Sequence, residues 1–414
     1  MYGFIKKRQY GLIRPIRLER AETTKRVYDL ELSRTKEFAL SHRGGVTCIR
    51  IDNSEQRYLL SGGGDGKVHI YDLDSMTEKN EPIASAARMD QHKYAVTSLS
   101  WYPADNGLFV TSSYDSTIKV WDTNEMKVTF NLKIRGGGKK VINDKKAVEE
   151  FNMECRVHCQ AMSSIANHSL VASAAAEPRI RLCDLANGSF THSLTGHSGS
   201  VMSCVWSTNQ EYVLYSGGSD GTIRVWDIRK ASSCLMSLDQ NNAGKSLKGI
   251  HIKGNDINLI TVDQNPLGET NSAHGRGING LTVTDDGRFL VSLGLDEKIR
   301  LWNTQSGHNT FVNYGSSWRN RFKLCLQPAL SSPDVWPPLL YIPSDDRQVL
   351  VYRLIDGMLV KRLKGAYGRV TSVENRVSHQ QLYSGSNAGD LLVWEPPAMI
   401  AAVEEREVCS MESK

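Results

Sequence analysis

A phrase of about forty residues recurs along the chain, and it constrains the fold more than any other feature. The clearest copy runs from His197 to Asp227. It reads as a histidine, an alternating apolar run, a second apolar run ending in Ser216, a Gly/Asp turn and the strand-like segment IRVWD. Alternation with a period of two, broken by tight turns, predicts short antiparallel strands. One copy therefore predicts one small sheet.

Seven such units follow one another. Each ends in an aromatic–acid pair or a variant of it, at Tyr71, Trp121, Cys183, Trp226, Trp302, Tyr352 and Trp394. The endings are 42 to 76 residues apart, and the short steps match the roughly 40–45 residues of one four-stranded propeller blade. The pattern resembles the WD40 family over residues 27–396, with repeats 3 and 6 degenerate. We expect an all-β, seven-bladed WD40 β-propeller with an N-terminal helical arm.

Repeat 4 carries four polar residues where WD40 repeats place a hydrogen-bonded tetrad: His197, Ser216, Asp220 and Trp226. The buried indole N–H needs an acceptor, and the aspartate closes a turn. Repeats 1, 2 and 5 offer the equivalent sets His42, Ser61, Asp65 and Tyr71; His92, Thr111, Asp115 and Trp121; and His274, Ser292, Asp296 and Trp302. In repeat 7, Tyr367 and Ala388 replace the histidine and the aspartate, so we expect a broken network. We assign these residues a structural role.

A ring needs a closing strand from its other end. Residues 27–33, VYDLELS, alternate and precede repeat 1, so we expect them to pair beside Leu391–Trp394 as the outer strand of the last blade. This divides the chain into an arm (1–26), a propeller (27–396) and a C-terminal tail (397–414). The arm contains two expected short helices, the second starting at Pro15. It is either a frayed basic tail or a helix–loop–helix that docks in a partner's groove.

Composition excludes several classes of protein. A net charge of +5 over 414 residues is weak for a nucleic-acid binder, so we expect no sequence-specific binding of nucleic acid. No apolar run reaches the ~18 residues of a membrane span, and the first residues lack a signal-peptide core. The eight cysteines are scattered, which indicates reduced packing residues in a cytosolic or nuclear protein.

Three segments interrupt the repeats. Residues 133–150 form a basic loop, which is either a nuclear-import patch or, more simply, a solvated charge run. Residues 239–273 are polar, and residues 315–338 contain Trp318, Arg319, Arg321 and Trp336. The sequence does not assign a role to any of them.

Three short segments resemble enzyme or metal-binding motifs, but each lacks a feature that its motif requires. Gly217–Gly221 matches G-x-S-x-G, but that motif needs a strand-to-helix elbow, and here it falls in a strand-to-strand turn. Residues 136–140, GGGKK, lack the spacing of a phosphate loop. Cys155, His158 and Cys159 lack a fourth ligand for tetrahedral zinc. We therefore expect no catalytic residue, no metal and no cofactor.

Departures from the repeat are the informative residues for function. Arg229 follows the Trp226–Asp227 pair by two residues and resembles the WDxR signature of cullin–RING ligase substrate receptors. A guanidinium can fork onto a partner's carboxylate or carbonyls; the alternative is a local salt bridge to another blade. The segments GFIKKRQYGL, PIRLERAETTKRVYDLEL, SWYPADNGLFVTSSYDSTIKVWDTN and VWDIRKASSCLMSLDQNN resemble the family of Cockayne syndrome group A proteins.

That resemblance implies a nuclear substrate receptor of a cullin-4-type ubiquitin ligase in transcription-coupled nucleotide excision repair. The implied partners are the triple-propeller adaptor, a repair ATPase of the Cockayne syndrome group B type and the stalled RNA polymerase II complex. The residues expected to bind the adaptor are Phe4, Ile5, Leu12, Ile16, Leu18, Arg20, Trp226, Asp227 and Arg229. Those expected to bind the substrate on the opposite face are Arg43, Tyr94, Tyr114, Arg276, Tyr367 and Arg369.

Two alternatives remain open from the sequence. One is a generic WD40 scaffold subunit of a chromatin or signalling complex, which would not need the arm together with Arg229. The other is a propeller hydrolase, for which the sequence offers no active-site set.

Overall fold

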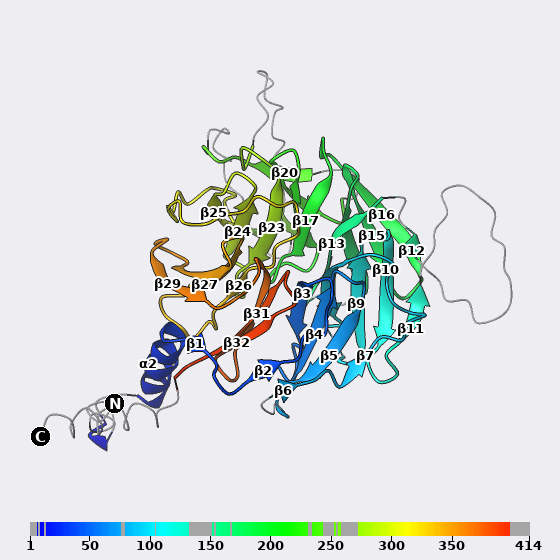
Figure 1. Cartoon of the computed structure of the whole chain (residues 1–414). Helices are drawn as coiled ribbons and strands as arrows, with labels where there is room; N and C mark the ends of the chain where they lie inside the picture. The colour runs from blue at the N-terminus through cyan, green and yellow to red at the C-terminus, as the bar shows by residue number, and fades with distance from the viewer. Residues whose placement is uncertain are drawn as a thin grey trace, which may run out of the picture.

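The computed structural model is a ring of seven β-sheet blades, with the helix α2 (Pro15–Tyr28) outside it (Figure 1). It describes residues 6, 9–11 and 14–397, except for 76–78, 104, 132–150, 153–154, 166–167, 231–233, 243–251, 254–255 and 258–271. The insertion 133–150, most of 239–273 and the tail from residue 398 lie outside the described residues, as do Phe4, Ile5 and Leu12. The seven-bladed propeller expected from the repeats is confirmed.

Blades 1 to 4 are antiparallel sheets whose strands follow the order of the chain. Blade 1 contains β3 (Val46–Ile51), β4 (Tyr58–Gly63), β5 (Val68–Asp72) and β7 (Ala84–Ser85). Blade 2 contains β8 (Val96–Trp101), β9 (Leu108–Ser113), β10 (Thr117–Asp122) and β11 (Lys127–Asn131), with β12 (Phe151–Asn152) beside β10. Blade 3 contains β13 (Val157–Met162), β14 (Leu170–Ala175), β15 (Arg179–Asp184) and β16 (Ser189–Thr195). Blade 4 contains β17 (Val201–Trp206), β18 (Val213–Gly218), β19 (Ile223–Asp227) and β20 (Cys234–Leu238).

Blades 5 to 7 complete the ring, and the degenerate repeats 3 and 6 still form four-stranded sheets. Blade 5 contains β23 (Ile278–Val283), β24 (Phe289–Gly294) and β25 (Ile299–Asn303). Blade 6 contains β26 (Ala329–Leu330), β27 (Leu339–Ser344), β28 (Gln348–Arg353) and β29 (Leu359–Lys364). Blade 7 contains β30 (Val370–Arg376), β31 (Gln381–Ser386), β32 (Leu391–Glu395) and β1 (Glu31–Leu32). Two small pairs lie outside the blades: β2 (Glu37–Phe38) with β6 (Lys79–Asn80), and β21 (Ile252–Lys253) with β22 (Asp256–Ile257).

The N-terminal strand closes the ring as the outer strand of blade 7. β1 pairs antiparallel with β32, with Glu31 opposite Glu395 and Leu32 opposite Trp394. The expected strand over residues 27–33 starts too early, because Val27 and Tyr28 belong to α2 (Pro15–Tyr28). The helix ends at Asp29, whose N–H caps the carbonyls of Lys25 and Arg26. The chain then turns into the strand, so the closing strand and the helix are directly joined.

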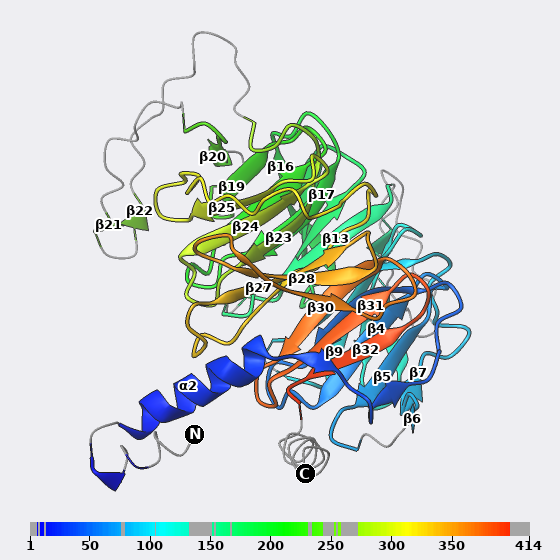
Figure 2. The same ribbon diagram turned by 60° about the vertical axis from the view of Figure 1, so that its left-hand side comes forward.

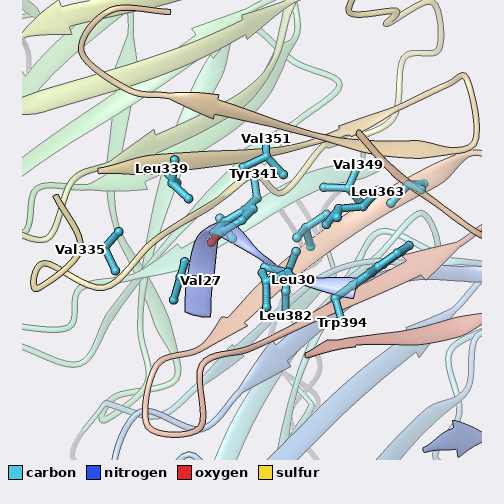
Figure 3. Close-up of a cluster of buried hydrophobic side chains, with 13 residues drawn as sticks. Val27, Leu30, Val335, Leu339, Tyr341, Val349, Val351, Leu363, Leu382 and Trp394 are labelled. Atoms are coloured by element: carbon cyan, nitrogen blue, oxygen red, sulfur yellow. The ribbon is translucent and has the colours of Figure 1, made fainter. Parts of the chain in front are cut away.

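A buried cluster fixes this junction to blades 6 and 7 (Figure 3). Val27 and Leu30 are 7% and 2% exposed and pack with Val335, Leu339 and Trp394. Burial of two aliphatic side chains contributes roughly 1.5–3 kcal/mol each. The C-terminal end of α2 is therefore part of the propeller core, which explains why a strand-like apolar residue such as Val27 is helical.

The hydrogen-bonded tetrad is present in blade 4. His197 Nδ1 lies 3.1 Å from Asp220 Oδ2 and its Nε2 lies 2.8 Å from Ser216 Oγ. The Trp226 indole donates to the same hydroxyl at 2.8 Å. Burial alone would raise the pKa of Asp220, but the hydrogen bond from His197 lowers it. The ionised carboxylate therefore anchors a buried polar chain across the blade.

Blades 1, 2 and 5 repeat this arrangement. The histidine-to-carboxylate distances are 3.2, 2.9 and 2.9 Å for the pairs His42–Asp65, His92–Asp115 and His274–Asp296. In blade 1 the tyrosine that replaces tryptophan bonds elsewhere, with Tyr71 Oη 2.8 Å from Ser41 Oγ. His42 holds the pKa of Asp65 at about 2, against the effect of burial.

The tetrad of blade 7 is interrupted, as expected, although the blade does contain a buried acid. Tyr367 does not enter the blade, since its side chain is 81% exposed. The missing carboxylate, however, comes from Asp390, two positions after Ala388. Its Oδ2 accepts from the Tyr367 N–H at 3.0 Å and from Ser386 Oγ at 3.0 Å. Trp394 still donates to Ser384 at 2.9 Å, but no hydrogen bond among the described residues joins Ser384 to Asp390, so the chain of hydrogen bonds seen in blade 4 is interrupted here.

Removing these carboxylates should destabilise the ring. Asp220→Ala leaves His197 Nδ1 and Thr222 without their acceptor and should cost about 1–3 kcal/mol of unfolding free energy. We expect a loss of the same size for Asp390→Ala. Tyr367→His alters an exposed side chain and should stay within roughly 0.5 kcal/mol of the unaltered protein. Chemical denaturation of the three variants checks this; equal losses for Tyr367→His and Asp220→Ala would contradict it.

Candidate functional site

The propeller has two faces, and the expected binding residues divide between them. The bottom face carries the turns that join first to second and third to fourth strands, including Tyr212 before β18 and Arg229 after β19. The top face carries the loops between blades and the turns that join second to third strands. The helix α2 contacts bottom-face turns, as described below. The bottom face is therefore the candidate site for the adaptor.

Arg229 is held in one orientation on this face. Its Nε donates to Asp227 Oδ1 at 3.0 Å and its Nη2 donates to Asp227 Oδ2 at 2.8 Å. The guanidinium also lies 5.3 Å from the centre of the Tyr212 ring, a cation–π contact. The Arg229 side chain remains 44% exposed, whereas that of Asp227 is 2% exposed. The salt bridge lies within blade 4 and does not join two blades, and the Arg229 side chain is partly exposed beside it.

Two residues that we expected to bind the adaptor cannot touch a partner. Trp226 is fully buried in its tetrad and Asp227 is 1% exposed. Burial opposes ionisation of Asp227, but hydrogen bonds from Arg229 lower its pKa. Trp226 therefore positions the strand end, and the Asp227 carboxylate positions Arg229.

The helix α2 lies against the bottom turns of blades 6 and 7, and its N-terminal end points away from the ring (Figure 2). Tyr28 Oη donates to Pro337 O at 3.2 Å, and the Trp336 N–H donates to Thr24 Oγ1 at 3.4 Å. Arg20 pairs with Asp334 at 3.2 Å. Both side chains of that pair are more than half exposed, so it contributes little to stability. Buried contacts at the C-terminal end hold the helix.

The N-terminal part of α2 carries the other described residues that we expected to bind the adaptor. Ile16 is 61% exposed and Leu18 is half-buried. Of the first expected helix, the structure describes residues 6 and 9–11, and the Tyr10 N–H donates to Lys6 O at 3.1 Å, as in a helical turn. Tyr10 and Ile16, which are 75% and 61% exposed, are therefore described arm residues that offer apolar surface to a partner.

The structure does not bring α2 and Arg229 into contact. Arg229 belongs to blade 4, while α2 contacts residues of blades 6 and 7. They share the bottom face, but blade 5 lies between the two areas. A single partner that touches both must cover much of this face.

Further exposed apolar side chains on the bottom face were not foreseen from the sequence. Tyr212 is 36% exposed beside Arg229, and Trp336 is 71% exposed beside α2. Others on bottom turns are Ile165, Ile355, Met358 and Val377. Aromatic residues and arginine are enriched at interface hot spots. The hydrophobic pattern could not single out these residues, because turn residues lack the alternation that marks strands.

The residues expected to bind substrate lie on the top face. Arg43, Tyr94, Arg276, Tyr367 and Arg369 lie in loops between blades, and Tyr114 lies in the turn between β9 and β10. Tyr94 and Tyr367 are 64% and 81% exposed. Tyr114 instead packs its ring 5.9 Å from that of His158, and burial raises its pKa to about 12. Tyr114 therefore contributes to the wall of the central channel more than to an open surface.

The central channel contains a cavity of about 230 Å³ on its bottom side. Its lining includes Cys159, Cys204 and Cys325, from the first strands of blades 3 and 4 and the segment before blade 6. Among the described residues, no three His, Cys, Asp or Glu side chains are grouped as metal ligands. Hydrogen bonds from the Cys204 and Cys325 thiols lower the pKa of Cys159.

The comparisons with known proteins agree with the architecture. The family model described as WD domain, G-beta repeat matches residues 33–72, 84–122, 188–227 and 266–303. The chain is 32% identical to the WD repeat-containing protein ATCSA-1 of Arabidopsis thaliana, over 96% of this chain and 95% of that protein. The chain belongs to the WD40 repeat family.

Two further relatives of this WD40 protein are more distant. Radiation-sensitive protein 28 of Saccharomyces cerevisiae is 26% identical over 80% of this chain and 61% of that protein. Histone acetyltransferase type B subunit 2 of Candida glabrata is 26% identical over 61% of this chain and 51% of that protein. In the part of the chain that the structure describes, no helix is long and apolar enough to cross a membrane.

The exposure of Trp336 can be tested by fluorescence. The other seven of the eight tryptophans are 4% exposed or less. We expect acrylamide to quench one accessible component of the emission, and Trp336→Phe should remove that component while Trp318→Phe should leave it. A quenching curve unchanged by Trp336→Phe would contradict the position of this loop.

Proposed function

We propose that this WD40 protein is a non-catalytic substrate receptor of a cullin-4-type ubiquitin ligase, acting in the nucleus in transcription-coupled nucleotide excision repair. Its bottom face and arm would hold the triple-propeller adaptor. Its top face would recruit a repair ATPase of the Cockayne syndrome group B type at a stalled RNA polymerase II complex. The sequence resemblance to Cockayne syndrome group A proteins and the similarity to ATCSA-1 along nearly the full length of both chains support this proposal.

One structural observation carries the adaptor part of the proposal. The Arg229 guanidinium is oriented by a buried carboxylate, is partly exposed and shares its face with a protruding helix. A pre-oriented guanidinium loses little further freedom on binding, so it suits bidentate recognition of a partner. The exposed Trp336 and Ile16 add apolar area of the kind found at the centre of interfaces.

A scaffold subunit of a chromatin or signalling complex is the alternative function. The relative named histone acetyltransferase type B subunit 2 favours it. That protein matches only 61% of this chain, and a generic scaffold gives no reason for the arm to lie on the same face as Arg229. We therefore prefer the ligase receptor.

Adaptor binding tests the proposal. Arg229→Glu replaces the cation with an anion beside Asp227, and reversal at a desolvated pair should weaken binding of the purified adaptor by about 2 kcal/mol or more. Deleting residues 1–22 spares β1 and the buried Val27, so the ring should still fold while affinity falls. Titration calorimetry measures both, and Lys93→Glu, an exposed cation on the top face, is the matched control.

Melting curves must show that each variant is folded. Arg229→Lys provides a second variant, because it retains the charge but cannot form the fork with Asp227. If the folded Arg229→Glu variant and the deletion both bind the adaptor as tightly as Lys93→Glu does, the proposed surface is wrong.

A further inference from the structure

The segment of residues 318–328, which precedes β26, starts on the top face and is held by hydrogen bonds to blades 5, 6 and 7. The Trp318 indole donates to Pro343 O at 2.9 Å. Asn320 exchanges hydrogen bonds with Asn279, and the Leu326 N–H donates to Asn279 O at 2.9 Å. The segment then pairs with blade 7, since Gln327 bridges to Ser372. Hydrogen bonds at both ends therefore fix the position of this segment.

This segment places an aromatic ring under an arginine of the neighbouring blade. The Arg369 guanidinium lies 3.9 Å from the centre of the Phe322 ring. Phe322 is 50% exposed and Lys323 is exposed. Within the described residues, the buried Nε of Arg369 has no hydrogen-bond partner. The arginine is therefore held by stacking and retains unused donors.

Two more residues complete what we call the mouth cluster: Arg43, Phe322, Lys323, Tyr367 and Arg369. Gly45, two positions after Arg43, lies against the backbone of Asn387 in blade 7. The Asn387 N–H in turn donates to Arg369 O at 3.0 Å. The loop of blade 1 that carries Arg43 is thus packed beside the loop that carries Tyr367 and Arg369.

Nearby acids are bonded to other residues and are not paired with the cations of the cluster. Glu297 pairs with Arg319 at 2.7 Å and Arg321 at 3.1 Å. Asp65 is bound by His42, and Asp390 accepts from a backbone N–H and a serine. Burial raises the pKa of Asp345, and the charge of Arg369 counteracts that rise. The Asp345 carboxylate accepts the Arg321 N–H at 2.6 Å. No carboxylate among the described residues forms a salt bridge with Arg43, Lys323 or Arg369.

We infer that the mouth cluster binds an acidic linear segment of a partner protein, one that carries carboxylates beside an aromatic or aliphatic residue. Guanidinium groups pair with carboxylates in a forked geometry, and exposed aromatics supply contact area at low entropy cost. This rests on the proposed role of the top face as the substrate side and specifies the partner's chemistry. A nucleic acid fits less well, because Arg369 already stacks on the Phe322 ring and few cations are present.

Fluorescence anisotropy with the full chain tests the inference. The probe is a short fluorescein-labelled peptide of Asp, Glu, Tyr and Gly; the comparison probes are its Asn/Gln counterpart and a labelled oligothymidylate. We expect binding of the acidic peptide alone, weakened by added salt. Lys323→Glu combined with Arg369→Glu should weaken it by about thirtyfold or more. Arg288→Glu, an exposed cation on the bottom face, should leave it unchanged.

Lys323→Glu alone keeps the test decisive if the double variant fails to fold, because Lys323 is an exposed side chain. Equal affinity for the acidic peptide and its Asn/Gln counterpart would overturn the inference, and so would oligothymidylate binding of equal strength or a folded double variant that binds normally. Adaptor affinity is measured on the same samples. If the protein binds the adaptor but not the peptide, the mouth cluster is rejected as a binding site and the proposed ligase role is unaffected. If it binds the peptide but not the adaptor, only the ligase role is rejected.

Discussion

Closure of the ring by the pairing of β1 with β32 is the interaction on which the other features depend. A circular array of blades is locked into a ring when a strand from one terminus completes the blade that the other terminus forms. Because the N-terminal strand does so here, with Leu32 opposite Trp394, the residues just before it must leave at the bottom of blade 7. The position of α2 beside Trp336 is thus a consequence of closure.

The tetrads stabilise individual blades, because their hydrogen bonds join residues of the same blade. In blade 4 the same Trp226–Asp227 pair serves two purposes, because its indole completes the buried network and its carboxylate orients Arg229. The structural repeat and the candidate binding residue are therefore coupled through adjacent positions. A change at Asp227 would disturb the surface through loss of orientation, even though the carboxylate itself is buried.

The repeat period was sufficient to predict the architecture, because its spacing and strand alternation are set by local chemistry. The start of the closing strand was placed too early, since burial of Val27 in the core overrides its strand propensity. The acid of blade 7 was missed because Asp390 is shifted by two residues from its usual position. Trp336 and Phe322 lie in an insertion without a repeat pattern, and only the fold determines that they are exposed, so the sequence could not assign either to a surface.

Hydrogen–deuterium exchange of the full chain, with and without the purified adaptor, tests whether ring closure presents the arm and Arg229 on one partner-binding face. We predict slower exchange on adaptor binding in α2, around Arg229 and in the loop that carries Trp336. We predict no change in residues 320–324 and 366–369 at the channel mouth. Slower exchange confined to the channel mouth, with α2 and Arg229 unaffected, would contradict this prediction.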